Sequence, residues 1–237
     1  MNNETLKIKI LDEDTIKNKR IIIIGDIHGC YDELLCLLQK IDYDRSSDIL
    51  ISVGDILMKG PNSIDVLNFF IYNKNTFCVL GNHEHTILNY YNMKKSAELD
   101  SEHKTFSKNM NDDQINFLNN LPHIIKIPKY DLIIVHAGIN PFIDINNNNP
   151  FDVMHIRNIL DNGVATEFVT SGNKWIDFWN GKETIIFGHD ARRRLQQTSN
   201  AIGLDTACVY GGSLTCIIYP DKKIISVDAL KIEKYNS

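Results

Sequence analysis

The sequence predicts an α/β fold in which two mixed β-sheets form a β-sandwich that is flanked by helices. The run from Ile21 to Ile24 is apolar at every position, which is typical of a strand that is buried on both faces. Helical patterns alternate with strands in the first half of the chain, whereas short strands joined by tight turns fill the last third. Helix-linked strands followed by antiparallel strands indicate two packed sheets with helices outside them.

The composition is that of a globular chain that is not divided into domains. Its 237 residues are 43% hydrophobic and 23% charged, and no linker rich in Pro, Gly or Ser interrupts them, so we expect one domain over residues 1–237. The net charge of −5 argues against DNA and membrane-surface partners. Five cysteines without a C-x-x-C pair suggest reduced thiols, and no apolar run could span a membrane, so we expect a cytoplasmic location.

Periodicity and turn residues place the individual elements. We expect strands at 21–24, 48–53, 77–80, 123–127, 131–136, 184–187, 201–204, 214–219 and 224–227. We expect helices at 31–41, 62–72 and 155–160, with a long loop at 141–151. The stretch 85–121 is predicted to be a helical insert over the site in two or three pieces. Its clearest piece is 112–121, because Asn111 can cap it and Pro122 stops it.

Five of the predicted strands end close to a glycine and a side chain that can bind a metal ion. The side chains at these strand ends are Asp26, His28, Asp55, Asn82, His136 and His189. Carboxylate, amide and imidazole donors without a thiolate suit Mn, Fe, Zn or a similar ion. Six ligands are too many for one tetrahedral ion and suit two ions that share a bridging carboxylate. Two ions about 3.5–4 Å apart are a device for in-line displacement at phosphorus.

The order of these motifs resembles a known family. GDIHG, GD…KGP, GNHE, HAG and GHD follow one another as in the calcineurin-like metallophosphoesterases, specifically the phosphoprotein-phosphatase superfamily, from Ile21 to about Asp228. The resemblance implies that one ion is held by Asp26, His28 and the bridging Asp55, and the other by Asp55, Asn82, His136 and His189. It further implies a metal-bridging hydroxide that attacks phosphorus in line, and His83 as the general acid for the leaving oxygen.

Two differences from the protein serine/threonine phosphatases indicate which subfamily the chain resembles. Those enzymes carry Asp-Arg-Gly after the bridging aspartate, where this chain has Met58, Lys59 and Gly60. The missing aspartate would have oriented the catalytic histidine, and the lysine keeps the charge of arginine but not its bidentate fork. The KGP sequence, GHDARRRLQ (188–196) and GLDTACVYGGSLT (203–215) resemble the ApaH-like phosphatases, relatives of the symmetrical diadenosine tetraphosphatases.

The absence of an aspartate at position 58 is consistent with a phosphoanhydride substrate. Expelling a serine alkoxide needs a well-placed proton donor, whereas a nucleoside di- or triphosphate leaves more readily, since phosphate protons titrate near about pH 6. An enzyme that lacks the aspartate behind its acid is therefore expected to favour anhydrides over serine or threonine esters.

Further side chains are candidates for substrate contact. We expect Lys59, Arg157, Tyr210 and one arginine of the 192–194 run, taken as Arg192, to face the substrate phosphates. Asp205 is expected to support a metal-ligating histidine from behind. Four other histidines match no ligand position and are interpreted as surface or satisfied residues: His85, His103, His123 and His155.

The leading functional hypothesis is a two-metal hydrolase of phosphoanhydrides with a small nucleotide or polyphosphate substrate. Symmetrical cleavage of diadenosine tetraphosphate to ADP is expected first, with an RNA cap or inorganic polyphosphate as related substrates. Mn²⁺ is the expected cofactor, with Fe, Zn or Co as alternatives. A protein serine/threonine phosphatase is the alternative function. A catalytically silent binding module of the same fold ranks below both, because all six ligands and His83 are present.

Overall fold

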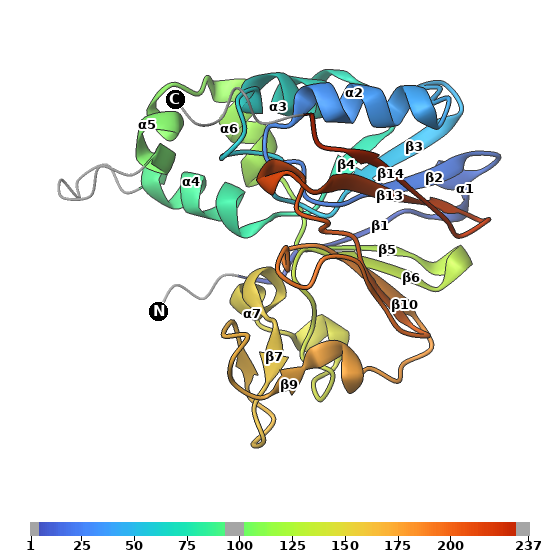
Figure 1. Cartoon of the computed structure of the whole chain (residues 1–237), viewed down its shortest axis with the longest axis vertical. Coiled ribbons are helices and arrows are strands. Elements are labelled where there is room, and N and C mark those ends of the chain that lie inside the picture. The colour runs from blue at the N-terminus through green and yellow to red at the C-terminus, as the bar shows by residue number, and fades with distance from the viewer. Residues whose placement is uncertain (1–4, 93–101, 231–237) are drawn as a thin grey trace.

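A computed structural model describes residues 5–92 and 102–230 of the chain. Two β-sheets pack against each other, and helices α2 (Tyr31–Lys40), α3 (Ser63–Tyr72) and α6 (Asp112–Asn119) lie outside the upper sheet (Figure 1). The predicted two-sheet sandwich with flanking helices is confirmed. That the whole of 1–237 is one domain stays a prediction.

The upper sheet carries the first three predicted strands. Its order is β14 (Lys223–Asp228), β13 (Ser213–Tyr219), β2 (Arg20–Ile24), β3 (Asp48–Ser52) and β4 (Thr76–Cys78). Strands β2, β3 and β4 run parallel, and β13 pairs antiparallel with both β2 and β14. The carboxyl ends of β2, β3 and β4 therefore meet at one edge of this sheet.

The second sheet supplies the remaining long strands. Its order is β1 (Ile8–Ile10), β5 (Ile124–Ile127), β6 (Leu132–Val135), β10 (Thr184–Phe187), β12 (Ala201–Gly203) and β11 (Gln196–Gln197). Strands β6, β10 and β12 are parallel neighbours. A small third sheet combines β8 (Ala165–Thr166), β7 (Asn158–Ile159) and β9 (Asn173–Lys174), and it lies at the lower end of the molecule (Figure 1).

The isoleucine run of β2 is explained by burial on both of its faces. Ile21 and Ile23 pack between the two sheets, whereas Ile22 and Ile24 pack toward the helices, in a core that includes Leu34 of α2. Successive side chains of a strand point to opposite faces, so a strand between two apolar layers needs an apolar residue at every position. This layering fixes the end of β2, and with it the position of Asp26.

The remaining helices connect strands along the chain. They are α1 (Glu13–Ile16), α4 (Asn82–Asn92), α5 (Glu102–Lys108), α7 (Pro150–His155) and the 3-10 turns η1 (Pro128–Tyr130), η2 (Ile145–Asn147), η3 (Trp175–Asp177) and η4 (Cys208–Tyr210). The expected insert at 85–121 contains the described helices α4, α5 and α6, while its residues 93–101 lie outside the described part. Among the described residues, no helix combines the length and apolar character needed to cross a bilayer.

Two local predictions have a clear outcome. Asn111 caps α6 as expected, and Gln114 bonds back to the Asn111 N–H to complete a capping box. The helix expected at 155–160 is wrong: α7 occupies 150–155, and 158–159 form a strand. The side chain of Asn149 caps α7, and Pro150 occupies its first turn. The end of the loop expected at 141–151 is therefore the start of this helix.

Candidate active site and metal centre

Six strand-end side chains converge where the two sheets meet. Asp26, Asp55 and Asn82 follow β2, β3 and β4 of the upper sheet, whose parallel register aligns Ile24 with Ser52 and Ser52 with Cys78. The second sheet contributes two more candidate ligands, because His136 and His189 follow the parallel neighbours β6 and β10. Ligands that are 163 residues apart in the chain thus reach one site: the backbone N–H of His189 donates to both carboxylate oxygens of Asp26 at 3.1 Å.

The carboxylate of Asp55 lies at the centre of the site. Its Oδ2 is 3.4 Å from His136 Nε2 and 3.6 Å from His28 Nε2. The same oxygen is 4.0 Å from His83 Nε2, and its Oδ1 accepts a hydrogen bond from the His83 N–H at 3.0 Å. One carboxylate oxygen that lies near the imidazole nitrogens of three histidines is in a position that suits a bridging ligand.

A second group of ligand atoms surrounds the side-chain oxygen of Asn82. Asn82 Oδ1 lies 2.9 Å from His136 Nε2 and 3.0 Å from His189 Nδ1. On the other side of Asp55, Asp26 Oδ2 is 4.0 Å from His28 Nε2. The six predicted side chains are therefore brought together, while their role as ligands and their division into two sets stay a proposal.

The histidine tautomers fit a metal ion. His28 Nδ1 faces the Leu57 carbonyl at 3.1 Å, and His136 Nδ1 faces the Val53 carbonyl at 2.9 Å. A carbonyl only accepts, so each Nδ1 carries a proton, which leaves Nε2, on the side of Asp55, as the ring nitrogen that can bind a metal ion once it has no proton. His189 is turned the other way, with Nδ1 toward Asn82 and its buried Nε2 without a hydrogen-bond partner among the described residues.

The buried charges also favour a cation. Burial and the neighbouring Asp205 raise the pKa of Asp26 well above its usual range. Burial alone would lower the pKa of His136, but the adjacent Asp55 outweighs it and raises this pKa to about 9. Acidic oxygens that are held together away from water repel one another, and divalent ions relieve that repulsion. Donor types, tautomers and charge therefore all fit divalent metal ions.

Glu84 holds the loop that carries Asp55, a role that the sequence analysis missed. Its fully buried carboxylate accepts from the backbone N–H groups of Asp55 at 2.9 Å, Leu57 at 3.0 Å and Gly81 at 3.2 Å. Burial, followed by the proximity of Asp55, raises the pKa of Glu84 to about 7. The glutamate of the GNHE motif thus joins the loops after β3 and β4, which carry two of the proposed ligands.

The glycines of the motifs leave room for ligand side chains. A Cβ atom at Gly188 would collide with Asp26 Oδ1, and one at Gly81 would collide with Asp55 Oδ1. The turns themselves carry strain at non-glycine residues, since His28, Asp55 and His189 adopt φ values of 48°, 49° and 68°. Such left-handed residues turn the chain sharply enough to aim the ligands back into the site.

A cavity of about 520 Å³ opens over these ligands. The predicted substrate residues Lys59, Arg157, Arg192 and Tyr210 all line it, as do Asp205 and Arg194. Lys59 Nζ lies 3.0 Å from His28 Nε2 and 5.4 Å from the centre of the Tyr210 ring. Cationic side chains thus surround a set of anionic and neutral ligands, which suits a polyanionic substrate.

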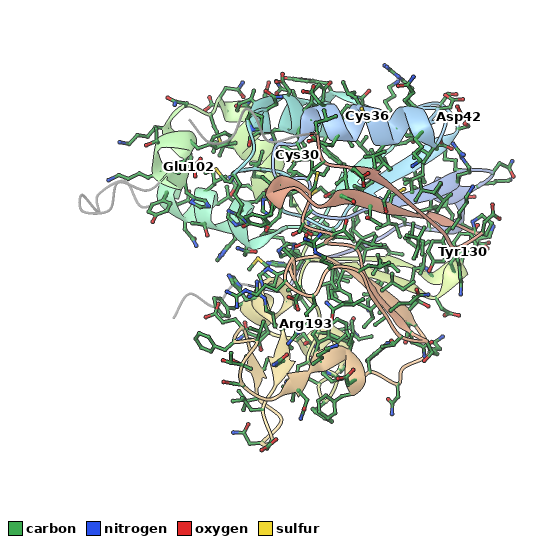
Figure 2. All side chains as sticks on the ribbon, in the orientation of Figure 1. Cys30, Cys36, Asp42, Glu102, Tyr130 and Arg193 are labelled. Carbon is green, nitrogen blue, oxygen red and sulfur yellow. The ribbon has the colours of Figure 1, made fainter. Side chains whose placement is uncertain are left out.

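The three consecutive arginines separate by role, which the sequence could not show. Arg193, labelled in Figure 2, pairs with Asp190 at 2.7 Å and donates to Asn158, so it holds the loop after β10 to the small sheet. Arg192 and Arg194 line the cavity. Arg157 also lines it, and its guanidinium donates to the carbonyls of Glu167 and His189 at 3.2 Å each.

Asp205 has a different contact from the one expected. Its carboxylate accepts from the Ala207 N–H at 3.0 Å and so stabilises a turn in which Ala207 has a φ of 64°. No histidine lies within hydrogen-bond distance of Asp205 in the described part of the chain. A supporting role toward a metal ligand stays a prediction.

His83 lies at the edge of the ligand set and contacts a histidine that the sequence analysis set aside. Its Nδ1 is 2.8 Å from His103 Nε2, and the two rings stack with centroids 4.9 Å apart. Burial lowers the pKa of His83 to about 3, against the opposing charge of Asp55, so the ring is neutral. The interpretation of His103 as a surface or merely satisfied residue overlooked this contact.

Removal of the Glu84 carboxylate is expected to destabilise the chain and its site together. Glu84→Ala leaves three buried N–H groups without their acceptor, and each unsatisfied group costs about 1–3 kcal/mol, so we expect a loss of at least about 3 kcal/mol in the free energy of unfolding. Urea unfolding followed by circular dichroism measures it, with the exposed Glu102→Ala as control. A loss equal to that of the control would contradict this role.

Gly188→Ala is expected to weaken metal binding. The new Cβ displaces Asp26, and disturbing the support of a metal ligand typically lowers affinity about 10- to 100-fold. Calorimetric titration with Mn²⁺ measures the affinity. The control is Gly163→Ala, whose Cβ would meet only Phe142 at 3.8 Å and which, unlike Gly188→Ala, carries the added strain of an alanine at a φ of 81°. Equal Mn²⁺ affinity in the two variants would refute the crowding argument.

Sequence comparisons place the chain among phosphoesterases. A family model described as calcineurin-like phosphoesterase matches residues 19–219. The symmetrical bis(5'-nucleosyl)-tetraphosphatase of Actinobacillus pleuropneumoniae serotype 5b (strain L20) is 27% identical over 267 residues, which cover 88% of this chain and 98% of that protein. The asymmetrical bis(5'-nucleosyl)-tetraphosphatase of Bacillus subtilis (strain 168) is 29% identical over 234 residues, which cover 86% and 93%.

Structural comparisons agree with the sequence comparisons. A crystal structure assigned as a diadenosine tetraphosphatase matches with a TM-score of 0.87 and 35% identity, covering 95% of this chain and 99% of that one. A protein serine/threonine phosphatase from Saccharomyces cerevisiae matches with a TM-score of 0.62 at 18% identity over 97% and 85%, a likeness of fold alone. Since the family model spans most of its length, the chain belongs to the calcineurin-like phosphoesterase family of metal-dependent hydrolases.

Proposed function

We propose that the chain hydrolyses dinucleoside tetraphosphates symmetrically, releasing two nucleoside diphosphates. The observation that carries the proposal is the cavity of about 520 Å³, in which four of the six proposed ligands share the lining with the cationic side chains of Lys59, Arg157, Arg192 and Arg194. A cluster of cations over a two-metal ligand set suits a chain of several phosphates better than a single phosphoryl group. The names of the two tetraphosphatase relatives support the same substrate class.

The proposed ligand sets are those that the sequence predicted. Asp26, His28 and Asp55 would hold one divalent ion, and Asp55 with Asn82, His136 and His189 would hold the other. Mn²⁺ is the ion that we propose, because carboxylate, amide and imidazole ligands suit it. Such a pair of ions supplies Lewis acidity and an activated water for in-line attack on phosphorus.

The chain's own residues would orient the substrate and its leaving group. Lys59 and Arg192 bind phosphate oxygens, and the ring of Tyr210, which is exposed in the cavity, offers a surface for a nucleobase. His83 presents Nε2 beside the bridging carboxylate, 4.0 Å from Asp55 Oδ2, where it can hold a proton at the leaving oxygen. That distance supports the role at the leaving oxygen that the sequence analysis expects of His83.

Symmetrical cleavage is favoured by the distribution of the cations. Lys59 Nζ lies 3.0 Å from His28 Nε2, on one side of the proposed ligands. On the opposite side, the guanidinium of Arg157 donates to the His189 carbonyl at 3.2 Å. Phosphates on both sides of the attacked phosphorus can therefore be neutralised. A substrate that is held in this way has its central anhydride bond at the metal centre.

Product analysis is expected to show ADP as the only nucleotide product. The Mn²⁺-loaded protein is incubated with diadenosine tetraphosphate, a capped RNA, polyphosphate and a phosphothreonine peptide, and the products are separated by chromatography, with Asp55→Asn as the inactive control. AMP with ATP would replace symmetrical by asymmetrical cleavage. Turnover of the capped RNA or polyphosphate alone would change the substrate, and a preference for the peptide would overturn the anhydride proposal.

Lys59→Ala is expected to lower kcat/KM for diadenosine tetraphosphate by about 100-fold, the usual effect of removing one donor that stabilises developing charge. Lys59→Arg keeps the charge and should retain most of the activity. The exposed Lys17→Ala is the control for a general change in surface charge. Steady-state kinetics on the dinucleotide decide the matter, and a Lys59→Ala enzyme with unchanged kcat/KM would remove Lys59 from the proposed site.

A further inference from the structure

His83 has a partner at the nitrogen that faces away from the metal ligands. His83 Nδ1 and His103 Nε2 are 2.8 Å apart, and their rings are stacked with an interplanar angle of 24°. On its other side, the His83 ring meets the His28 ring edge-on with centroids 5.0 Å apart. The imidazole of His83 is therefore held between a proposed metal ligand and His103.

His103 comes from helix α5, which lies beside the loop that carries Met58. It is the second residue of α5, whose first residue, Glu102, is labelled beside α4 in Figure 2. Glu102 and Phe106 of α5 line a cavity of about 270 Å³ together with Met58. Met58 stands where the protein phosphatases carry the aspartate of their Asp-Arg-Gly motif, and here it is buried in the apolar core.

A histidine partner differs from an aspartate in the direction of its hydrogen bond. A carboxylate can only accept, so it holds a histidine whose Nδ1 carries a proton. An imidazole N–H can donate, so it holds a neutral histidine whose Nδ1 accepts and whose single proton is on Nε2. In this chain His83 Nε2 lies 4.0 Å from Asp55 Oδ2, and both residues line the cavity, so a proton on Nε2 would be directed at the reacting groups.

We propose that His103 is the positioning residue for His83: its Nε2–H donates to His83 Nδ1 and so fixes the ring with its Nε2–H directed at the leaving oxygen. This inference rests on the proposed function. His83 then acts as a hydrogen-bond donor to the leaving oxygen instead of transferring its proton: the oxygen of the attacking water forms the new bond to phosphorus, and the leaving nucleoside diphosphate takes the electron pair of the broken P–O bond and departs as an anion. An alkoxide leaving group would need the proton itself, so the pair selects for anhydrides.

Three substitutions at position 103 separate this role from a structural one. We expect His103→Ala to lower kcat for diadenosine tetraphosphate by between about 10-fold and 100-fold with little change in KM, because a misplaced reacting group costs that much. His103→Asn keeps an N–H donor and should recover most of the loss. Thr105→Ala, at an exposed position of the same helix, is the control.

His103→Asp gives the most specific result, because a carboxylate accepts where the histidine donates. With aryl phosphates of graded leaving-group pKa, we expect this variant to turn over the poor leaving groups better, relative to the good ones, than wild type does. The slope of log kcat against leaving-group pKa therefore becomes shallower. A residue that merely supports the fold would lower all of these rates by one common factor.

The outcomes keep this inference distinct from the proposed function. If wild-type protein with bound Mn²⁺ leaves diadenosine tetraphosphate intact, the proposed function fails. If wild type is active and His103→Ala matches Thr105→Ala, the inference alone fails. Equal losses in His103→Ala and His103→Asn, with an unchanged slope in His103→Asp, also overturn it. Melting temperature and bound Mn²⁺, measured for every variant, show whether a rate was lost through unfolding or loss of metal.

Discussion

The carboxylate of Asp55 is the constraint on which the rest of the site depends. It must stay buried and charged within 3.4 to 4.0 Å of three imidazole nitrogens, a position that is costly without hydrogen bonds to its loop. Glu84 provides those bonds from the backbone side, and Gly81 leaves room for Oδ1. The sandwich of apolar strands holds both loops in place, so the stability of the fold offsets the electrostatic cost of the site.

Much of the fold and the ligand set could be predicted because each clue is local in sequence. The Ile21–Ile24 run reports burial on both faces of a strand, and a glycine beside a ligand at a strand end is visible within three residues. Parallel strands then bring such ends together without any further information. The six candidate ligand side chains from five strand ends therefore lie close together, even though Asp26 and His189 lie far apart in the chain.

The features that could not be predicted depend on packing between distant elements. The motif GNHE displays Glu84, but only the structure shows that its carboxylate reaches back to the loop after β3. Arg192 and Arg193 are adjacent in sequence, but Arg192 lines the cavity whereas Arg193 forms an ion pair with Asp190. This difference depends on where Asp190 lies. His103 has no neighbouring motif at all. It reaches His83 only because α5 packs against α4.

The pairing of His83 with His103 gives a physical account of the motif change at Met58. A buried apolar residue at that position removes a carboxylate from the surroundings of the catalytic histidine, and a second imidazole occupies the distal nitrogen instead. With His103 as the proposed donor, the exchange reverses the hydrogen bond, so that the partner donates rather than accepts. A phosphate leaving group tolerates the reversal because it departs as an anion, whereas a serine or threonine alkoxide does not. Substrate preference in this branch of the family would then depend on whether His83 accepts or donates the hydrogen bond at its Nδ1. The proposed metal ligands and the sandwich that positions them would stay the same.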